Sequence, residues 1–211
     1  MKRYRRHLYL ILVSILLIGA APAKNQWIRV RWVSDGDTVV LADGRHVRYI
    51  GINAPEIAHD NSKAEAFGYT AKKYNRQLVG LKKVRLEFDK EMHDRYGRLL
   101  AYVFLSDGTF VNKKMIEQGY AYVLPRMPNV KYEGILLQAQ RDAMSKKKGL
   151  WQHWEEKEGV YVGSKSSRRF HLKTCPYGKR IKKRNRIIFK RKWDAFWSGF
   201  APGKKCLAGG N

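Results

Sequence analysis

The stretch SDGDTVVLADGRHVRYIGINAPE, residues 34–56, contains two turn signals, DGD and ADG, each followed by a run rich in apolar and β-branched residues. With the apolar alternation directly before it, this order predicts three consecutive antiparallel strands. The same stretch holds Asp35, Asp37, Arg48 and Glu56. Because strands normally bury one apolar face and keep charges apart, this concentration of charge indicates a functional site at the strand ends.

Beyond residue 56 the apolar residues change between the helical and the strand period. The predicted elements are a helix over 62–79, strands within 82–89 and over 99–105, a short helix over 111–119 and a longer helix over 132–147. Ser62 is the predicted N-cap of the first helix. Five strands with a helix after the third match an OB-type barrel. We therefore predict an α+β fold: a five-stranded OB-type β-barrel with flanking helices, plus a small C-terminal α/β module.

Two residues at the predicted strand ends carry hard oxygen donors. Asp37 leaves the DGD turn with a carboxylate, and Asn53 ends the third strand with an amide oxygen. Calcium accepts carboxylate, amide and carbonyl oxygens with flexible geometry, so the two residues indicate a site for a hard cation. The simpler interpretation is that DGD is only a polar turn.

Arg48 lies in the middle of a strand and Arg98 follows a YG turn. Guanidinium groups bind phosphate oxygens bidentately, so both arginines could face a phosphoryl group. The alternative is ordinary pairing with the nearby acids Asp43, Glu87, Asp89 and Asp94. Glu56 follows Pro55, whose fixed φ restricts the direction of the carboxylate, and such a carboxylate can activate water for attack on phosphorus.

The motifs DGDT, VRYIGINAPE and DRYGRLLAYV, in this order and at this spacing, resemble the staphylococcal nuclease family. The resemblance covers residues 27 to about 152 and extends to LEFDK, GTFVNKKMIEQGYA and the closing KKGLW. It implies a calcium-dependent endonuclease that hydrolyses phosphodiester bonds of DNA and RNA with little sequence preference and leaves 3′-phosphates.

Carried over motif by motif, the resemblance implies a role for nine residues. They are Asp37, Asn53 and the carbonyl of Ala54 for the cation, with Asp35 behind them; Arg48 and Arg98 for the phosphate; Glu56 as general base; and Arg95 and Tyr96 along the nucleotide.

Two departures from the family pattern affect these roles. Asn53 stands where the family has a second metal-ligating acid, and we expect the lost charge to lower calcium affinity. The stretch YVLPRMPNVKYE, residues 122–133, does not reproduce the family's tyrosine-bearing nucleotide platform. It leaves base stacking, and the choice between DNA and RNA, open.

The chain begins with four basic residues, an apolar run from Leu8 to Ala21 and the small residues before Lys24. This pattern predicts a secretory signal peptide, residues 1–23, cleaved near Ala23, and hence a secreted or extracytoplasmic protein. The alternative is an uncleaved membrane anchor.

Basic residues are unevenly distributed. The chain carries 43 Lys and Arg against 18 Asp and Glu, a formal charge of +25. Residues 24–159 hold 24 basic and 17 acidic residues, whereas residues 160–211 hold 15 and one. This shift predicts a boundary near Gly159, between a barrel domain and a basic module. Such a charge indicates a polyanionic partner, either nucleic acid or, transiently, an anionic cell surface.

The last fifty residues resemble the small metal-binding module of the Ada DNA-repair protein, although Gly203 replaces one expected cysteine. His171, Cys175 and Cys206 remain as ligand candidates, one short of a closed zinc site. In an exported chain the two cysteines favour one disulfide, with zinc or free thiols as the alternatives.

The sequence thus favours a secreted, monomeric calcium-dependent nuclease. A non-catalytic OB-fold protein that binds extracellular nucleic acid is the alternative, as is a protein that binds wall polymer or anionic lipid. We expect the module after Gly159 to be a separate grip on long nucleic acid, so that its removal hardly changes hydrolysis of a dinucleotide.

Overall fold

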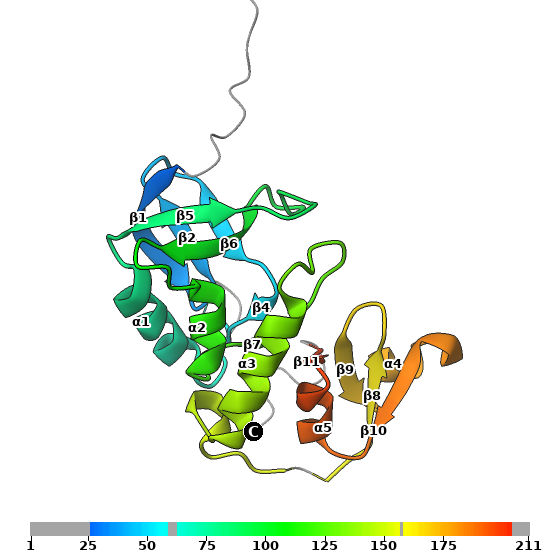
Figure 1. Cartoon of the computed structure of the whole chain (residues 1–211). Coiled ribbons are helices and arrows are strands. Elements are labelled where there is room, and N and C mark those ends of the chain that lie inside the picture. The colour runs from blue at the N-terminus through cyan, green and yellow to red at the C-terminus, as the bar shows by residue number, and fades with distance from the viewer. Residues whose placement is uncertain (1–25, 59–62, 157, 204–211) are drawn as a thin grey trace, which may run out of the picture.

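The computed structural model describes residues 26–58, 63–156 and 158–203. Five strands close into a barrel in the order β1-β2-β3-β6-β5, in which β3 and β6 are parallel and the other neighbours antiparallel. Helices flank the barrel, so the predicted five-stranded OB-type α+β fold is confirmed (Figure 1).

The elements up to residue 151 are β1 (Trp27–Asp35), β2 (Thr38–Leu41), β3 (His46–Tyr49), β4 (Ile52–Asn53), α1 (Gly68–Val79), β5 (Lys83–Glu87), β6 (Leu99–Leu105), α2 (Val111–Glu117), β7 (Tyr122–Val123), α3 (Glu133–Ser145) and η1 (Gly149–Trp151). β4 and β7 form a separate two-stranded sheet that links the third barrel strand to the chain before α3.

Two buried asparagines fasten the helices to the barrel. Asn75 of α1 accepts a hydrogen bond from the Tyr49 hydroxyl at 3.0 Å and donates to the carbonyl of Asp35 at 3.0 Å. Asn112 of α2 donates to the carbonyl of Ile50 at 2.9 Å. Buried amides cost free energy unless they are paired, so these contacts specify how α1 and α2 dock. The docking of α1 also supports the turn that follows Asp35.

Helix α1 begins later than predicted, at Gly68 rather than residue 62. Phe67 precedes it in the left-handed conformation and makes no side-chain capping bond, and Ser62 lies outside the described residues. The amide of Glu65 donates to the carbonyl of Glu56 at 2.9 Å, and a Cβ at Gly68 would lie 2.3 Å from that carbonyl oxygen. The residues directly before α1 are therefore held against residue 56 in a non-helical conformation.

The C-terminal segment, described over residues 160–203, contains a four-stranded sheet in the order β10-β8-β9-β11. Its elements are β8 (Tyr161–Ser164), β9 (Arg169–Leu172), α4 (Pro176–Lys179), η2 (Lys183–Asn185), β10 (Arg186–Phe189), α5 (Lys192–Trp197) and β11 (Ala201–Pro202). The segment lies beside α3 (Figure 1).

The core of the C-terminal segment is shared with the rest of the chain. A hydrophobic cluster joins Phe170 and Phe196 of the segment to Tyr122, Met144 and Trp151 of the preceding part. A second cluster, which fills the barrel, consists of residues before position 140. The regions on either side of the predicted boundary near Gly159 differ in charge, but both contribute residues to the first of these hydrophobic clusters.

Polar contacts also attach the segment to α3. Gln140 accepts a hydrogen bond from the amide of Val123 at 2.6 Å and donates to the carbonyl of Phe196 at 2.5 Å. Arg168 forms an ion pair with Glu133 at 3.2 Å. Gln140 of α3 thus connects β7 to α5. Because its side chain is fully buried, water could not replace these hydrogen bonds if they were lost.

No helix among the described residues is long and apolar enough to span a membrane. The predicted signal peptide, residues 1–23, lies outside the described part of the chain.

Candidate functional site

The DGD turn joins β1 to β2 at one end of the barrel and buries both of its acids. Asp35 Oδ1 accepts the amide of Asp37 at 2.9 Å, and Asp37 Oδ1 accepts the Thr38 hydroxyl at 3.1 Å. A Cβ at Gly36 would lie 2.4 Å from the Cβ of Ala54. Only glycine allows the turn to approach residue 54 this closely, which brings the acids to the end of β4.

Asp37 is the centre of the resulting cluster. Its Oδ2 accepts the amide of Ala54 at 2.7 Å and pairs with Arg48 Nη2 at 2.9 Å. Burial raises the pKa of Asp37 to about 8; Arg48 acts against this shift and the neighbouring Asp35 adds to it. Burial and the neighbouring Asp35 together outweigh Arg48, so the charged form of Asp37 is disfavoured, and a further cation bound beside it would favour that form.

Asn53 is held by three hydrogen bonds. Its Oδ1 accepts Arg48 Nη2 at 3.2 Å, and its Nδ2 donates to the carbonyl of Ala54 at 3.0 Å and to the Tyr122 hydroxyl at 2.9 Å. An aspartate at this position could not donate to the Ala54 carbonyl. Tyr122, which sequence reasoning did not single out, thus supports the residue that departs from the family pattern.

The donor set of this cluster fits a hard cation. The side chains of Asp35, Asp37 and Asn53 and the carbonyl of Ala54 supply oxygen only, as calcium prefers. Two carboxylates are few for such a site, and the described residues include no group of three or more His, Cys, Asp or Glu placed to hold a metal. The arrangement can therefore accept a cation, but with less negative charge than a three-carboxylate site.

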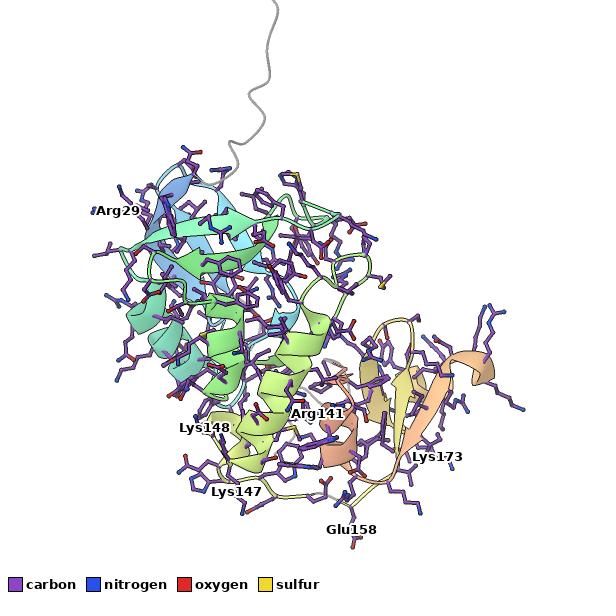
Figure 2. All side chains as sticks on the ribbon, viewed as in Figure 1. Arg29, Arg141, Lys147, Lys148, Glu158 and Lys173 are labelled. Carbon is purple, nitrogen blue, oxygen red and sulfur yellow. The ribbon has the colours of Figure 1, made fainter. Side chains whose placement is uncertain are left out.

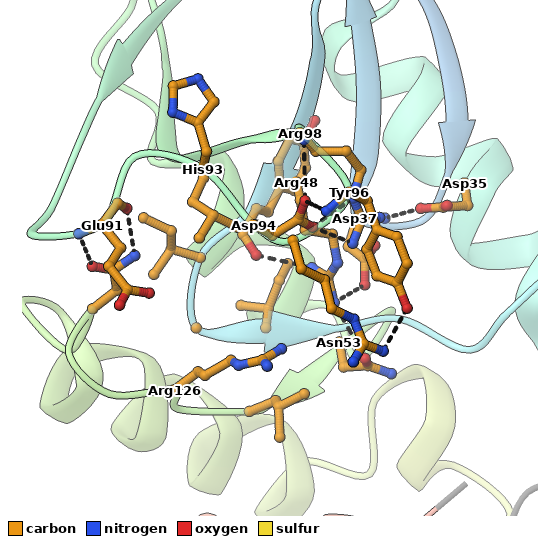
Figure 3. Close-up of a pocket in the computed structure, with 18 of the residues that line it drawn as sticks. Asp35, Asp37, Arg48, Asn53, Glu91, His93, Asp94, Tyr96, Arg98 and Arg126 are labelled. Atoms are coloured by element: carbon orange, nitrogen blue, oxygen red, sulfur yellow. Dashed lines mark hydrogen bonds and ion pairs between the residues drawn. The ribbon is translucent and has the colours of Figure 1, made fainter. Parts of the chain in front are cut away.

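The two predicted phosphate-binding arginines are both oriented by acids. Arg48 also donates through Nη1 to the carbonyl of Tyr49 at 2.9 Å. Arg98 meets Asp94 through Nε at 2.8 Å and Nη2 at 2.7 Å. Burial acts to raise the pKa of Asp94, but hydrogen bonds from Arg98 and from backbone amides hold it below its usual value. Arg98 thus pairs with Asp94, one of the nearby acids considered in the sequence analysis. This ion pair holds the Arg98 guanidinium at the wall of the pocket (Figure 3).

Glu56 is half-buried and lines the same pocket. Its amide donates to Glu65 Oε2 at 3.0 Å, and its carbonyl accepts the amide of Glu65 at 2.9 Å. With buried Pro55 before it, the backbone of Glu56 is fixed on both sides. A carboxylate on such a backbone can be aimed at one point in the pocket.

Arg95 and Tyr96 lie on the exposed turn before β6. The guanidinium carbon of Arg95 lies 4.8 Å and that of Arg98 5.6 Å from the centre of the Tyr96 ring. Cation–π contacts of this kind stabilise the turn at the pocket rim. An exposed ring at this place can also stack on a planar group.

These residues surround one pocket of about 800 Å³. Of the nine residues implied by the resemblance, all except Ala54 line it, and Ala54 contacts Asp37 directly. Arg126, Asn129 and Glu91 line it as well, and Asn129 links the loop before α3 to the loop before β6 through hydrogen bonds of 2.8 and 2.7 Å with the backbone of Glu91.

The pocket also includes Arg169, the first residue of β9 in the C-terminal segment. Sequence reasoning did not find it, because it is one of 15 basic residues after position 159 with no motif to distinguish it. The expectation that the segment is separate from the site is wrong in this respect.

Cys175 is in a disulfide, and none of the described cysteines is free. Its predicted partner, Cys206, lies outside the described residues, so the pairing stays a prediction. His171 Nδ1 lies 3.9 Å from the Cys175 sulfur and stacks on Tyr177. Since a disulfide sulfur is no thiolate ligand, the disulfide at Cys175 argues against the zinc alternative.

Comparison with known proteins adds an independent observation. The family model for staphylococcal nuclease homologues matches residues 46–153. A thermonuclease of Staphylococcus hyicus is 38% identical over 136 residues, which are 63% of this chain and 80% of the relative. A thermonuclease of Staphylococcus intermedius is 38% identical over 126 residues, 58% and 74% of the two chains. Endonuclease YncB of Bacillus subtilis is 39% identical over 122 residues, 56% and 57%.

Proposed function

Because the chain belongs to the staphylococcal nuclease family, we propose that it is a nuclease that hydrolyses phosphodiester bonds of nucleic acids. More specifically, we propose a calcium-dependent endonuclease that acts on DNA and RNA with little sequence preference and leaves 3′-phosphates. The observation that carries the proposal is the meeting of Asp37, Arg48, Glu56 and Arg98 in one pocket.

Glu56 is the proposed general base. Its fixed backbone directs the carboxylate into the pocket, where it accepts a proton from the water that attacks phosphorus. Glu56→Gln would keep the shape of the side chain and remove this capacity.

Arg48 and Arg98 are the proposed phosphate ligands. Their acid partners hold each guanidinium in place before substrate binds, so little reorganisation is required when negative charge grows on the phosphoryl oxygens. Arg95 and Tyr96, at the rim, would lie along the nucleotide next to the cleaved bond.

Asp37, Asn53 and the carbonyl of Ala54, with Asp35 behind them, would hold the calcium ion. A bound divalent cation would polarise the phosphate and lower the pKa of water beside it. The Asn53 side chain keeps its oxygen towards Arg48 and its nitrogen towards Ala54, so we propose that calcium binds weakly.

The polyanionic substrate accounts for the formal charge of +25. We further propose that the chain acts as a monomer, is exported after cleavage near Ala23 and makes transient contact with anionic cell surfaces. N-terminal sequencing of the protein recovered outside the cell would test the cleavage site.

The direct test is incubation of the purified protein with plasmid DNA and with single-stranded RNA, in calcium or in chelator, followed by analysis of the product ends. The proposal expects both substrates to be degraded in calcium only, with 3′-phosphate ends. Binding without cleavage in calcium would instead support the non-catalytic OB-fold alternative.

A further inference from the structure

The C-terminal segment supplies a second wall of the pocket. In β9, Phe170 is fully buried in the cluster shared with α3, so the alternation of a strand directs Arg169 to the opposite face. That face meets the pocket, where Arg169 is half-buried. Arg169 Nη1 donates to the carbonyl of Pro202 in β11 at 2.6 Å, which holds the guanidinium in place.

Arg126 lines the same pocket from the loop before α3 (Figure 3), and its charge acts on Arg169. Burial lowers the pKa of Arg169, and the positive charges of Arg48 and Arg126 lower it further. The second wall therefore brings two arginines near a third of the same charge, an arrangement that costs free energy in the absence of an anion.

The arginines of the two walls differ in their partners. Arg48 and Arg98 are each paired with an aspartate. Among the ion pairs of the described chain, none includes Arg126 or Arg169. Glu65, whose charge also reaches Arg169, is bound to the amide of Glu56. Positive charge on this wall is thus available to a ligand.

We propose that Arg126 and Arg169 bind a second phosphate of a single-stranded polynucleotide, adjacent to the phosphate held by Arg48 and Arg98. This inference rests on the proposed function, because it takes the first phosphate to be the one that is hydrolysed. The C-terminal segment then completes the substrate site, and the enzyme prefers substrates with several consecutive phosphates to a dinucleotide with one.

The size of the pocket supports this choice of ligand. About 800 Å³ is far more than one phosphate group requires and lies in the range of pockets that hold larger ligands. A nucleic-acid strand presents phosphates at regular intervals, so one strand can satisfy both walls. Guanidinium groups match phosphate oxygens in geometry as well as charge.

The test compares three single-stranded DNA oligonucleotides of about a dozen nucleotides that share one preferred cleavage position. One carries only phosphates. Each of the other two carries one neutral methylphosphonate, at the linkage on the 5′ side of that position in one strand and on the 3′ side in the other. The variants are Arg126→Ala, Arg169→Ala and Arg169→Lys. Lys173→Ala removes one charge from the outer side of the same segment and serves as the matched control (Figure 2).

On the all-phosphate strand, Arg169→Ala and Arg126→Ala should each lower kcat/KM about tenfold, as expected for a lost charged hydrogen bond. One of the two methylphosphonates should lower the kcat/KM of the wild type by a similar factor, because it removes the phosphate charge that the arginines bind. On that strand, the kcat/KM of each variant should lie within about twofold of the wild-type value on the same strand. Arg169→Lys should retain part of the effect, and Lys173→Ala should stay close to wild type on every strand.

Equal losses by Arg169→Ala on the charged and the neutral strands, or no loss on either, would overturn the inference. Thermal unfolding identifies a variant that is merely unstable, and Arg126→Ala, at an exposed position, then decides the result. If the wild type cleaves none of the strands, the proposed function fails. Binding of the second phosphate is then tested by fluorescence anisotropy of the uncleaved strands. Weaker binding of the all-phosphate strand by Arg169→Ala than by the wild type supports a second phosphate site, and equal binding rejects it.

Discussion

The two walls of the pocket use arginine in opposite ways. On the barrel wall, Arg48 and Arg98 pair with acids at 2.9 and 2.7 Å. On the second wall, Arg126 of the loop before α3 and Arg169 of the C-terminal segment line the pocket outside the ion pairs of the described chain. A paired arginine is oriented before its ligand arrives, while an unpaired one keeps more of its charge for the ligand. The contrast indicates that the barrel wall serves the reaction and the second wall serves binding.

The largest expected effect would separate these two roles. Glu56→Gln should lower kcat by roughly 10²–10⁴-fold, since a lost general base costs about this much, and should leave strand binding nearly unchanged. Stopped-flow or gel assays measure the rate, and anisotropy measures binding. Glu117→Gln, a helix-surface acid paired with Lys113, is the control. A Glu56→Gln enzyme that turns over at the wild-type rate would remove Glu56 from the mechanism.

The next effect concerns the core that the two regions share. Phe196 is 4% exposed and packs edge-on against Tyr122, with ring centres 5.5 Å apart. Phe196→Ala should lower the free energy of unfolding by about 3–5 kcal/mol. Because Tyr122 holds Asn53, we also expect weaker calcium binding. Chemical denaturation measures the first effect and calcium titration the second.

Ile188→Ala, at a 52% exposed position of the same segment, should change stability by less than about 0.5 kcal/mol. Independent unfolding of the barrel and the segment, with Phe196→Ala affecting only the segment, would contradict a shared core.

A smaller effect is expected at the one ligand position that departs from the family. Asn53→Asp adds a carboxylate and removes the donor that binds Ala54, so without calcium the protein should lose about 1–3 kcal/mol of stability. In calcium the extra charge should tighten binding and recover part of that loss. Isothermal titration and thermal unfolding check both signs. Unchanged or weaker calcium binding would show that residue 53 is not a ligand.

The smallest effect tests how the barrel wall orients Arg98. The pKa of Asp94 is held below its usual value, so its pairing contributes stability that is present above the unfolded pKa near 3.8 and is lost as pH falls through the folded pKa. Asp94→Asn should therefore cost about 1 kcal/mol or less at neutral pH, and nothing well below pH 3.8. Unfolding curves across this pH range measure the difference, and a loss that persists at low pH would assign it to packing.

Much of the barrel and of its site could be predicted because the information is local. The DGD and ADG turns specify strand reversals within a few residues, Asp35 and Asp37 belong to the first of these turns, and Glu56 directly follows Pro55. The start of α1 was predicted wrongly because Ala64 and Phe67 fit a helical spacing, while the observed chain before Gly68 is held by backbone contact with residue 56. That contact joins two segments and leaves no trace in the periodicity of either.

The sequence by itself determined the closed barrel, the acids and arginines at its end and the strongly basic character of the last fifty residues, since strand alternation, turn chemistry and composition are properties of neighbouring residues. Only the tertiary structure decided that Arg169 enters the pocket, that Tyr122 holds Asn53 and that Phe196 completes a core begun by Trp151. Each of these contacts joins residues far apart in the chain. Pairing of β4 with β7 places Tyr122 opposite Asn53, while burial of the apolar face shared by α3 and α5 positions Phe196 and the C-terminal segment. No single stretch of sequence encodes either contact.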